Sequence, residues 1–176
     1  MKSRICILGL SKEYTNKIAE NLAKKLDMFY LDVDALVEYE IVNPAYIEMQ
    51  CGVDYLAKLQ RDCVKRAVSF ENSLLTMDYT LLNDNDNLKV IKKECLIIYV
   101  NLSKESYEKK LNKDKTKKLR QILDVFMFNE RNKICESIAE ISIDSNGKSY
   151  LQVANLAKIE ITNYYKNVLL GDKKWV

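Results

Sequence analysis

The sequence contains no histidine, and its 176 residues include only four glycines and one proline. The lack of histidine excludes Ser-His-Asp and Cys-His catalysis. The shortage of glycine disfavours any site that depends on a glycine-lined backbone cradle. No apolar run approaches the ~18 residues of a membrane-spanning helix, so we expect no membrane contact.

The cysteines are arranged in a way that excludes two common roles. They are odd in number, widely spaced and form no CxxC pair: Cys6, Cys51, Cys63, Cys95 and Cys135. This pattern disfavours a zinc site or a disulfide framework and is typical of a reducing compartment. Because the chain also starts with a strand-like segment and no signal-peptide pattern, we predict a cytoplasmic protein. The net charge of +3 gives little support for a nucleic-acid partner.

Apolar strand-like runs alternate with amphipathic helical segments along the chain. The predicted strands are residues 4–8, 29–31, 73–76, 96–100 and 141–143; the predicted helices are 15–26, 35–40, 53–70, 85–92, 103–111, 120–138 and 150–166, with a C-terminal tail over 167–176. No repeat or flexible linker interrupts them, so we predict one domain over residues 1–176. The alternation predicts an α/β fold, a three-layer α/β/α architecture around a parallel sheet of about five strands.

Three stretches connect this pattern with a known family. They read FYLDVDALVE (29–38), LIIYVNLSKESYEKKL (96–111) and NERNKICESIAEISIDSNG (129–147). In this order they resemble shikimate kinase over nearly the whole chain, and the third resembles that family's ERxPxYxxxADxxVDT stretch. The resemblance implies a P-loop kinase fold, ATP-dependent phosphorylation of a small molecule and a place in aromatic amino acid biosynthesis.

The resemblance also shows a degenerate nucleotide loop. The family motif is GxxGxGKS/T, and here only Gly9 remains. Lys12 and Tyr14 stand at the second and third glycines, Thr15 at the phosphate-binding lysine and Asn16 at the magnesium-binding hydroxyl. Non-glycine residues at positive φ cost about 1–2 kcal/mol each. The lost lysine charge is worth on the order of 4 kcal/mol at ~4 Å. We therefore expect no ATP or Mg²⁺ as cofactor.

Two further residues of this turn suggest what replaced the phosphate. Ser11 and Glu13 lie at the start of the first predicted helix. Unpaired N–H groups and the helix dipole favour an anion there. We hypothesise that the Glu13 carboxylate, or Ser11 as a cap, fills the role of the phosphate.

The acceptor site implied by the resemblance is partly retained. Asp34 matches the aspartate that holds shikimate hydroxyls, and Arg131 matches one of two arginines that clamp the carboxylate. The other arginine becomes Ala57, and the glycine triplet after the third strand becomes Asp78, Tyr79 and Thr80. The Asp78 carboxylate would repel the carboxylate of a substrate.

The lid and the metal position are also changed. Residues 112–119 (NKDKTKKL) would be a lid remnant, in which Lys117 and Lys118 replace the family's Arg-Pro pair. A lysine lacks the planar fork of arginine, which holds two oxygens at once. Asp32 matches a magnesium-associated position and is expected to be vestigial. In the simplest alternative, Asp32 and Asp34 cap a helix, Arg131 makes a structural ion pair, and the lysines are solvated.

Four functions are compatible with this pattern. We favour an inactive shikimate-kinase-like protein with a ligand-binding, regulatory or protein-interaction role, whose partner is an unknown protein or an anionic small molecule. The main alternative is an active kinase in which Lys12, Lys17 or Lys117 replaces the lost lysine. The third is a binding module for an anionic metabolite that uses Arg131, Asp34 and the lid lysines. The fourth is an oligomeric scaffold with contacts through the aromatic tail residues Tyr164, Tyr165 and Trp175.

Overall fold

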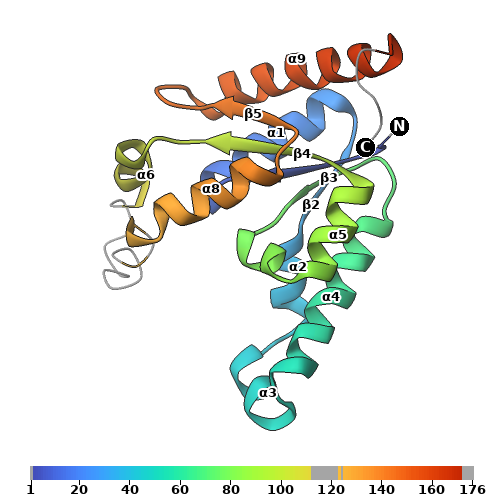
Figure 1. Cartoon of the computed structure of the whole chain (residues 1–176), viewed down its shortest axis with the longest axis vertical. Coiled ribbons are helices and arrows are strands. Elements are labelled where there is room, and N and C mark those ends of the chain that lie inside the picture. The colour runs from blue at the N-terminus through green and yellow to red at the C-terminus, as the bar shows by residue number, and fades with distance from the viewer. Residues whose placement is uncertain (1, 112–122, 124, 172–176) are drawn as a thin grey trace.

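A computed structural model of the chain describes residues 2–111, 123 and 125–171. Five parallel strands form one sheet in the order β2-β3-β1-β4-β5. Helices cover both faces of this sheet (Figure 1). The predicted three-layer α/β/α fold with about five parallel strands is therefore confirmed.

In chain order the described elements are β1 (Arg4–Leu8), α1 (Lys12–Leu26), β2 (Phe29–Asp32), α2 (Val33–Glu40), α3 (Pro44–Cys51), α4 (Val53–Ser69), β3 (Ser73–Thr76), the 3-10 helix η1 (Tyr79–Asn83), α5 (Asn85–Glu94), β4 (Cys95–Asn101), α6 (Lys104–Leu111), α8 (Phe128–Ile138), β5 (Ile141–Asp144) and α9 (Tyr150–Leu169).

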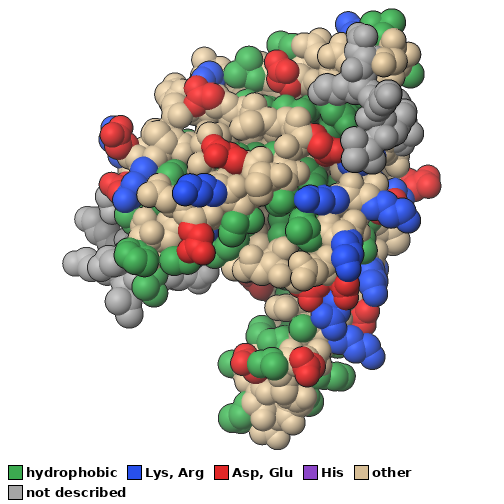
Figure 2. Space-filling model, viewed as in Figure 1, with side chains coloured by type: hydrophobic (Ala, Val, Ile, Leu, Met, Phe, Trp, Pro, Cys, Tyr) green, Lys and Arg blue, Asp and Glu red, His purple; other side chains and the backbone are tan. Residues whose placement is uncertain are grey.

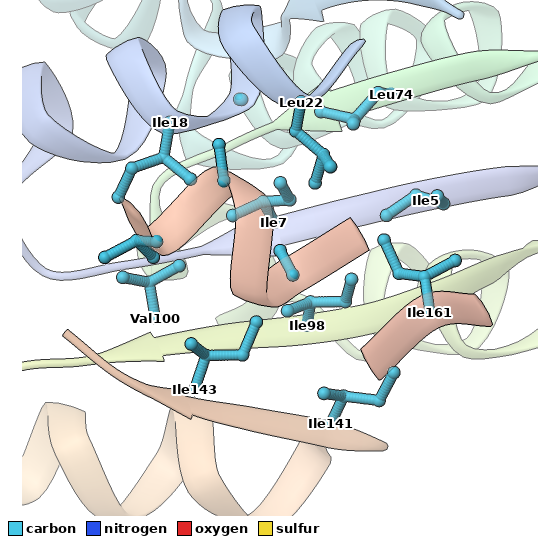
Figure 3. Packing of buried hydrophobic residues seen from close by; sticks show 14 of the residues in the cluster. Ile5, Ile7, Ile18, Leu22, Leu74, Ile98, Val100, Ile141, Ile143 and Ile161 are labelled. Atoms are coloured by element: carbon cyan, nitrogen blue, oxygen red, sulfur yellow. The ribbon is translucent and has the colours of Figure 1, made fainter. Parts of the chain in front are cut away.

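The sheet separates two hydrophobic cores, because side chains along a strand alternate between its faces. On β1, Ile5 and Ile7 face the core formed with α1 and α9, and Figure 3 shows this packing. Cys6 and Leu8 face the core on the other side, which includes residues of α2, α4, α5 and α8. A strand buried on both faces reads as a continuous apolar run, which explains why RICIL was recognisable from sequence.

Helix α9 closes the first core. Val153, Ala154, Ala157 and Ile161 of this helix are buried against the sheet. A capping box starts the helix, because the Ser149 hydroxyl accepts from the Gln152 N–H and the Gln152 side chain accepts from the Ser149 N–H. Near its end, the Tyr165 hydroxyl donates to the Lys2 carbonyl at 2.7 Å. The last helix thus packs on the first strand.

The structure differs from the predicted elements in four main places. Helix α1 starts at Lys12 rather than Thr15, and α9 continues to Leu169, into the predicted tail. Helix α3 and the 3-10 helix η1 were not predicted. For α3 the reason is physical, since none of its residues is buried and its sequence has no apolar periodicity. The predicted lid at 112–119 and the end of the tail at 172–176 lie outside the described residues.

Candidate functional site

The carboxyl ends of the parallel strands bring several predicted residues to one edge of the sheet. Strand β1 leads into Gly9, β2 ends at Asp32, and β3 leads into Asp78. The strand order reverses at β1, because its neighbours β3 and β4 continue the sheet in opposite directions. In open parallel sheets ligands bind outside the strand ends at such a point, so this edge is the candidate site. The lid residues Lys117 and Lys118 lie outside the described part of the chain.

The turn after β1 is filled, because helix α1 starts within it at Lys12. The Thr15 N–H donates to the Ser11 carbonyl at 2.9 Å, as in an ordinary first helical turn. The Thr15 side chain is buried, and its Oγ1 lies so close to Gly9 that a Cβ on residue 9 would overlap it. Between residues 10 and 16 no residue has a positive φ. The space directly above Gly9 therefore holds the Thr15 side chain.

The helix propensities of the residues in this turn explain why α1 starts at Lys12 and not at Thr15. A glycine in a helix interior is about 1 kcal/mol less favourable than alanine, whereas lysine is close to alanine. Lys12 and Tyr14 stand where the family motif has glycine, so both substitutions favour helix. A phosphate nest needs inward-pointing N–H groups and residues that alternate between right- and left-handed conformations. The Thr15 N–H is already engaged within α1, so this turn does not fit a triphosphate in the manner of a P-loop.

Tyr14 ties the turn after β1 to the other end of the chain. Its hydroxyl donates to the Lys148 carbonyl at 2.8 Å, in the turn between β5 and α9. The Lys110 ammonium, at the end of α6, lies 3.5 Å from the centroid of the Tyr14 ring. Burial raises the pKa of Tyr14, so the hydroxyl stays protonated at neutral pH. Sequence reasoning identified Tyr14 only as a lost glycine, and no local signal pointed to Lys110 or Lys148.

The hypothesis that Ser11 or Glu13 replaces a bound phosphate is not supported. Ser11 stands at the N-cap position of α1, as predicted, but its side chain makes no capping hydrogen bond. The Glu13 carboxylate pairs with Lys17 at 2.6 Å, and its side chain is 82% exposed. An acidic residue in the first turn complements the helix dipole. It does so here from the exposed side of the helix, whereas Thr15 fills the space above Gly9.

Asp32 caps α2, as the simplest alternative predicted. Its Oδ1 accepts from the Ala35 N–H at 3.1 Å, and its Oδ2 accepts from Asn16 Nδ2 at 2.7 Å. Both carboxylate oxygens are thus engaged. The donor to Oδ2 is Asn16, which stands at the position of the family's magnesium-binding hydroxyl. Among the described residues, no group of three or more Cys, Asp or Glu side chains could hold a metal ion. These residues do not fit a magnesium site of the family type.

Asp34 does not cap a helix but joins two segments of the site. Its Oδ1 accepts from the Asp78 backbone N–H at 3.1 Å. Its Oδ2 lies 3.7 Å from Lys12 Nζ, which also lies 3.6 Å from Glu38. Burial raises the pKa of Asp34 to about 6, although the Asp78 N–H and the Lys12 ammonium lower it; the carboxylates of Asp78 and Asp32 add to the rise. The carboxyl group therefore titrates close to neutral pH.

The remaining acceptor-site residues are only partly brought together. The Arg131 guanidinium carbon lies 4.8 Å from the centroid of the Tyr79 ring, in a cation–π contact. The Asp78 carboxylate turns back to accept from the Thr80 N–H at 2.8 Å and caps η1. Ala57, at the position of the second arginine, contributes only a methyl group from α4. The structure thus connects Asp34 with Asp78 and Arg131 with Tyr79.

An open parallel sheet with its candidate site at the ends of β1, β2 and β3 is the architecture of the P-loop kinases and related α/β proteins. A model of the shikimate kinase family matches residues 16–162, and the chain belongs to this family. The matched region begins at Asn16, directly after the turn in which Thr15 covers Gly9. Within the described residues, no helix is both long and apolar enough to cross a membrane.

Individual relatives are distant. A shikimate kinase of Clostridium botulinum is 21% identical over 100 residues, and that match spans 57% of this chain and 61% of the relative. A shikimate kinase of Dehalococcoides mccartyi is 20% identical over 173 residues, which cover 93% of this chain and 96% of the relative. The crystal structure of a shikimate kinase from Aquifex aeolicus has a TM-score of 0.70 at 22% identity and covers 96% of this chain and 99% of that one. At this identity the structural likeness establishes the fold alone.

Proposed function

We propose that this chain is a member of the shikimate kinase family that no longer transfers phosphate from ATP and that acts by binding. The observation that carries the proposal is the contact of Thr15 with Gly9 at the end of β1. In the family motif the corresponding loop holds a phosphate, whereas here the Thr15 side chain occupies the space beside Gly9. The N–H of the same residue is engaged within α1. A triphosphate could enter only if the first turn of α1 unwound and Thr15 left its buried position.

The test compares nucleotide binding and phosphotransfer in the same preparation. We expect millimolar ATP with Mg²⁺ to leave the melting temperature unchanged, and no ADP to form when shikimate is added. The shikimate kinase of Aquifex aeolicus, assayed in parallel, is the positive control. ATP-dependent phosphorylation of shikimate by the pure protein would contradict the proposal and favour the active kinase with a rebuilt site.

The ligand that we propose is a small anion held at the acceptor side of the site. Support comes from two cations, the retained Arg131 over Tyr79 and Lys12 of the turn after β1, which lies beside Asp34. The Asp34 side chain is still 15% exposed, so it is not completely closed off from the surface. An arginine can hold a carboxylate or a phosphate with two parallel hydrogen bonds.

Calorimetric titration with shikimate, quinate and inorganic phosphate separates these ligands. We expect Arg131→Ala to weaken binding by about tenfold to a hundredfold, the range for a lost charge-assisted contact. Lys17→Ala is the matched control, because it removes a cation of α1 that pairs only with the exposed Glu13 among the described ion pairs. Equal loss in both variants would show that the effect is one of general charge.

A further inference from the structure

The α3 tip, defined as residues 39–55, projects from the body of the molecule (Figure 1). It comprises the end of α2, the whole of α3 and the start of α4. No residue of α3 is buried, and Ile47 is the one that is partly buried against the core. Short helices in proteins depend on tertiary packing of one face. Helix α3 has little of this packing within the described chain.

The α3 tip exposes large apolar side chains at a high density. They come from its three helical segments and from the turn between α2 and α3, where Val42 lies: Tyr39, Val42, Tyr46, Met49, Val53 and Tyr55. Val42 is 88% and Met49 72% exposed. Figure 2 shows hydrophobic side chains over the projecting tip, together with acidic ones. Single exposed apolar residues are ordinary on a surface, whereas several on one projecting segment are typical of an interaction site.

The charge of the α3 tip has one sign. No lysine or arginine occurs between Lys25 and Lys58, whereas the tip carries Glu40, Glu48 and Asp54. Glu40 is paired with Arg66 of α4. Glu48 and Asp54 form no ion pair with any residue in the described ranges. The apolar surface is therefore accompanied by uncompensated negative charge.

We propose that the α3 tip is a docking surface for a basic amphipathic helix of another protein. Helices α3 and α4 are in contact and both expose apolar side chains, so together they can receive the apolar face of a third helix. Lysines and arginines that flank this face would complement Glu48 and Asp54, which is the arrangement that favours encounter and suppresses wrong partners. A second copy of the chain would bring carboxylates together, and an anionic lipid surface would repel them. The inference goes beyond the loss of phosphotransfer and does not depend on it.

The test uses two synthetic amphipathic helices, one of leucine and lysine and one of leucine and glutamate, with binding followed by fluorescence anisotropy. We expect saturable binding of the lysine peptide and at least about tenfold weaker binding of the glutamate peptide. Val42→Ser with Met49→Ser should weaken binding of the lysine peptide by about tenfold or more. Glu48→Gln with Asp54→Asn should weaken it and reduce its dependence on salt.

The matched control is Ile159→Ser with Leu169→Ser, which removes two exposed apolar side chains of α9. It should leave binding unchanged. All of these positions are exposed, so the variants should unfold at the temperature of the parent protein. No binding of the lysine peptide, equal binding of both peptides, or equal loss in the α9 control would overturn the proposal. So would a homodimer in light scattering that Val42→Ser with Met49→Ser dissociates. Detection of kinase activity would contradict only the proposed function.

Discussion

The Thr15 hydroxyl occupies the place that a Cβ on Gly9 would take, where the turn after β1 meets the first turn of α1. This contact explains why residue 9 is a glycine, even though its φ is not positive. The requirement is one of space and not of backbone conformation. In this chain a larger residue 9 would overlap the Thr15 side chain, whereas in the family motif the corresponding glycine belongs to a phosphate loop.

Gly9→Ala should destabilise the protein, because the new methyl group overlaps Thr15 Oγ1. We expect a loss of about 1–3 kcal/mol in the free energy of unfolding, as for other overpacked sites. Thr15→Ala in the same chain removes the overlapping hydroxyl and should recover part of the loss. Urea denaturation of the two single variants and the double variant measures this coupling.

The control for this cycle is Ser11→Ala, which removes a hydroxyl of the same turn that makes no capping hydrogen bond. Its effect should remain within about 0.5 kcal/mol. Strict additivity of Gly9→Ala and Thr15→Ala would show that the two residues do not compete for the same space.

Tyr14→Phe should cost about 1–2 kcal/mol of stability, because it leaves the Lys148 carbonyl without the hydroxyl donor that it now has at 2.8 Å. The ring and its packing are kept, so only the hydrogen bond is tested. Chemical denaturation is again the measurement. Tyr39→Phe, at a side chain that is 83% exposed, should have no effect. If both variants behave alike, Tyr14 does not hold the β5–α9 turn.

The ionisation of Asp34 should make stability fall as pH rises from about 4 to about 6. The pKa of Asp34 is about 6 in the folded protein and near the ordinary 3.8 when unfolded, so the folded state binds more protons in this range. Asp34→Asn removes this term, which is on the order of 3 kcal/mol. The free energy of unfolding, measured from pH 3.5 to 8, should therefore fall less with pH in the variant.

The quantity to compare is the difference in the free energy of unfolding between Asp34→Asn and the parent protein at each pH. Asp84 and Asp144 have lowered pKa values, because backbone N–H groups and a nearby arginine or lysine stabilise their charged forms. Their contribution to stability grows with pH and is present in both proteins. A difference that does not change with pH would show that Asp34 has an ordinary pKa in the folded protein.

Lys12→Ala should raise the pKa of Asp34 further, because the Lys12 ammonium lies 3.7 Å from Asp34 Oδ2 and lowers that pKa. The carboxyl carbon of Asp34 can be titrated by NMR in both proteins. Lys17→Ala, which removes a cation that pairs with Glu13, should leave the titration of Asp34 where it is. A midpoint that stays unchanged in Lys12→Ala would mean that Lys12 points away from Asp34 in solution.

The strands could be predicted accurately from the sequence, and the reason lies in their burial. Arg4–Leu8 and Ser73–Thr76 have the predicted bounds, since both are apolar runs inside a parallel sheet. The start of α1 was predicted too late, because the apolar face that marks the helix begins only at Ile18, whereas the helix itself starts at Lys12. Local propensity was the better guide there.

The candidate site was predictable as a set of positions but not as a set of contacts. The resemblance pointed to Asp32, Asp34 and Arg131, and the structure has Asp32 at the end of β2, Asp34 in the first turn of α2 and Arg131 in α8 over the Tyr79 ring. The partners of these residues are different. Asn16 donates to Asp32 and the Asp78 N–H donates to Asp34, and these pairs are 16 and 44 residues apart in the chain. No periodicity or local motif specifies such long-range pairs, and they depend on how the strands are ordered in the sheet.

The position of α9 has a consequence for synthesis of the chain. Ile5 and Ile7 share their core with α1, which follows β1 directly, and with α9, which spans residues 150–169. In a nascent chain on the ribosome this core therefore stays incomplete, with α1 in place but α9 missing, until residues 150–169 have been translated. Non-local contacts of this kind form late and leave apolar surface open to aggregation in the meantime. Cellular yield should thus respond to chaperone supply more than the stability of the finished fold would suggest.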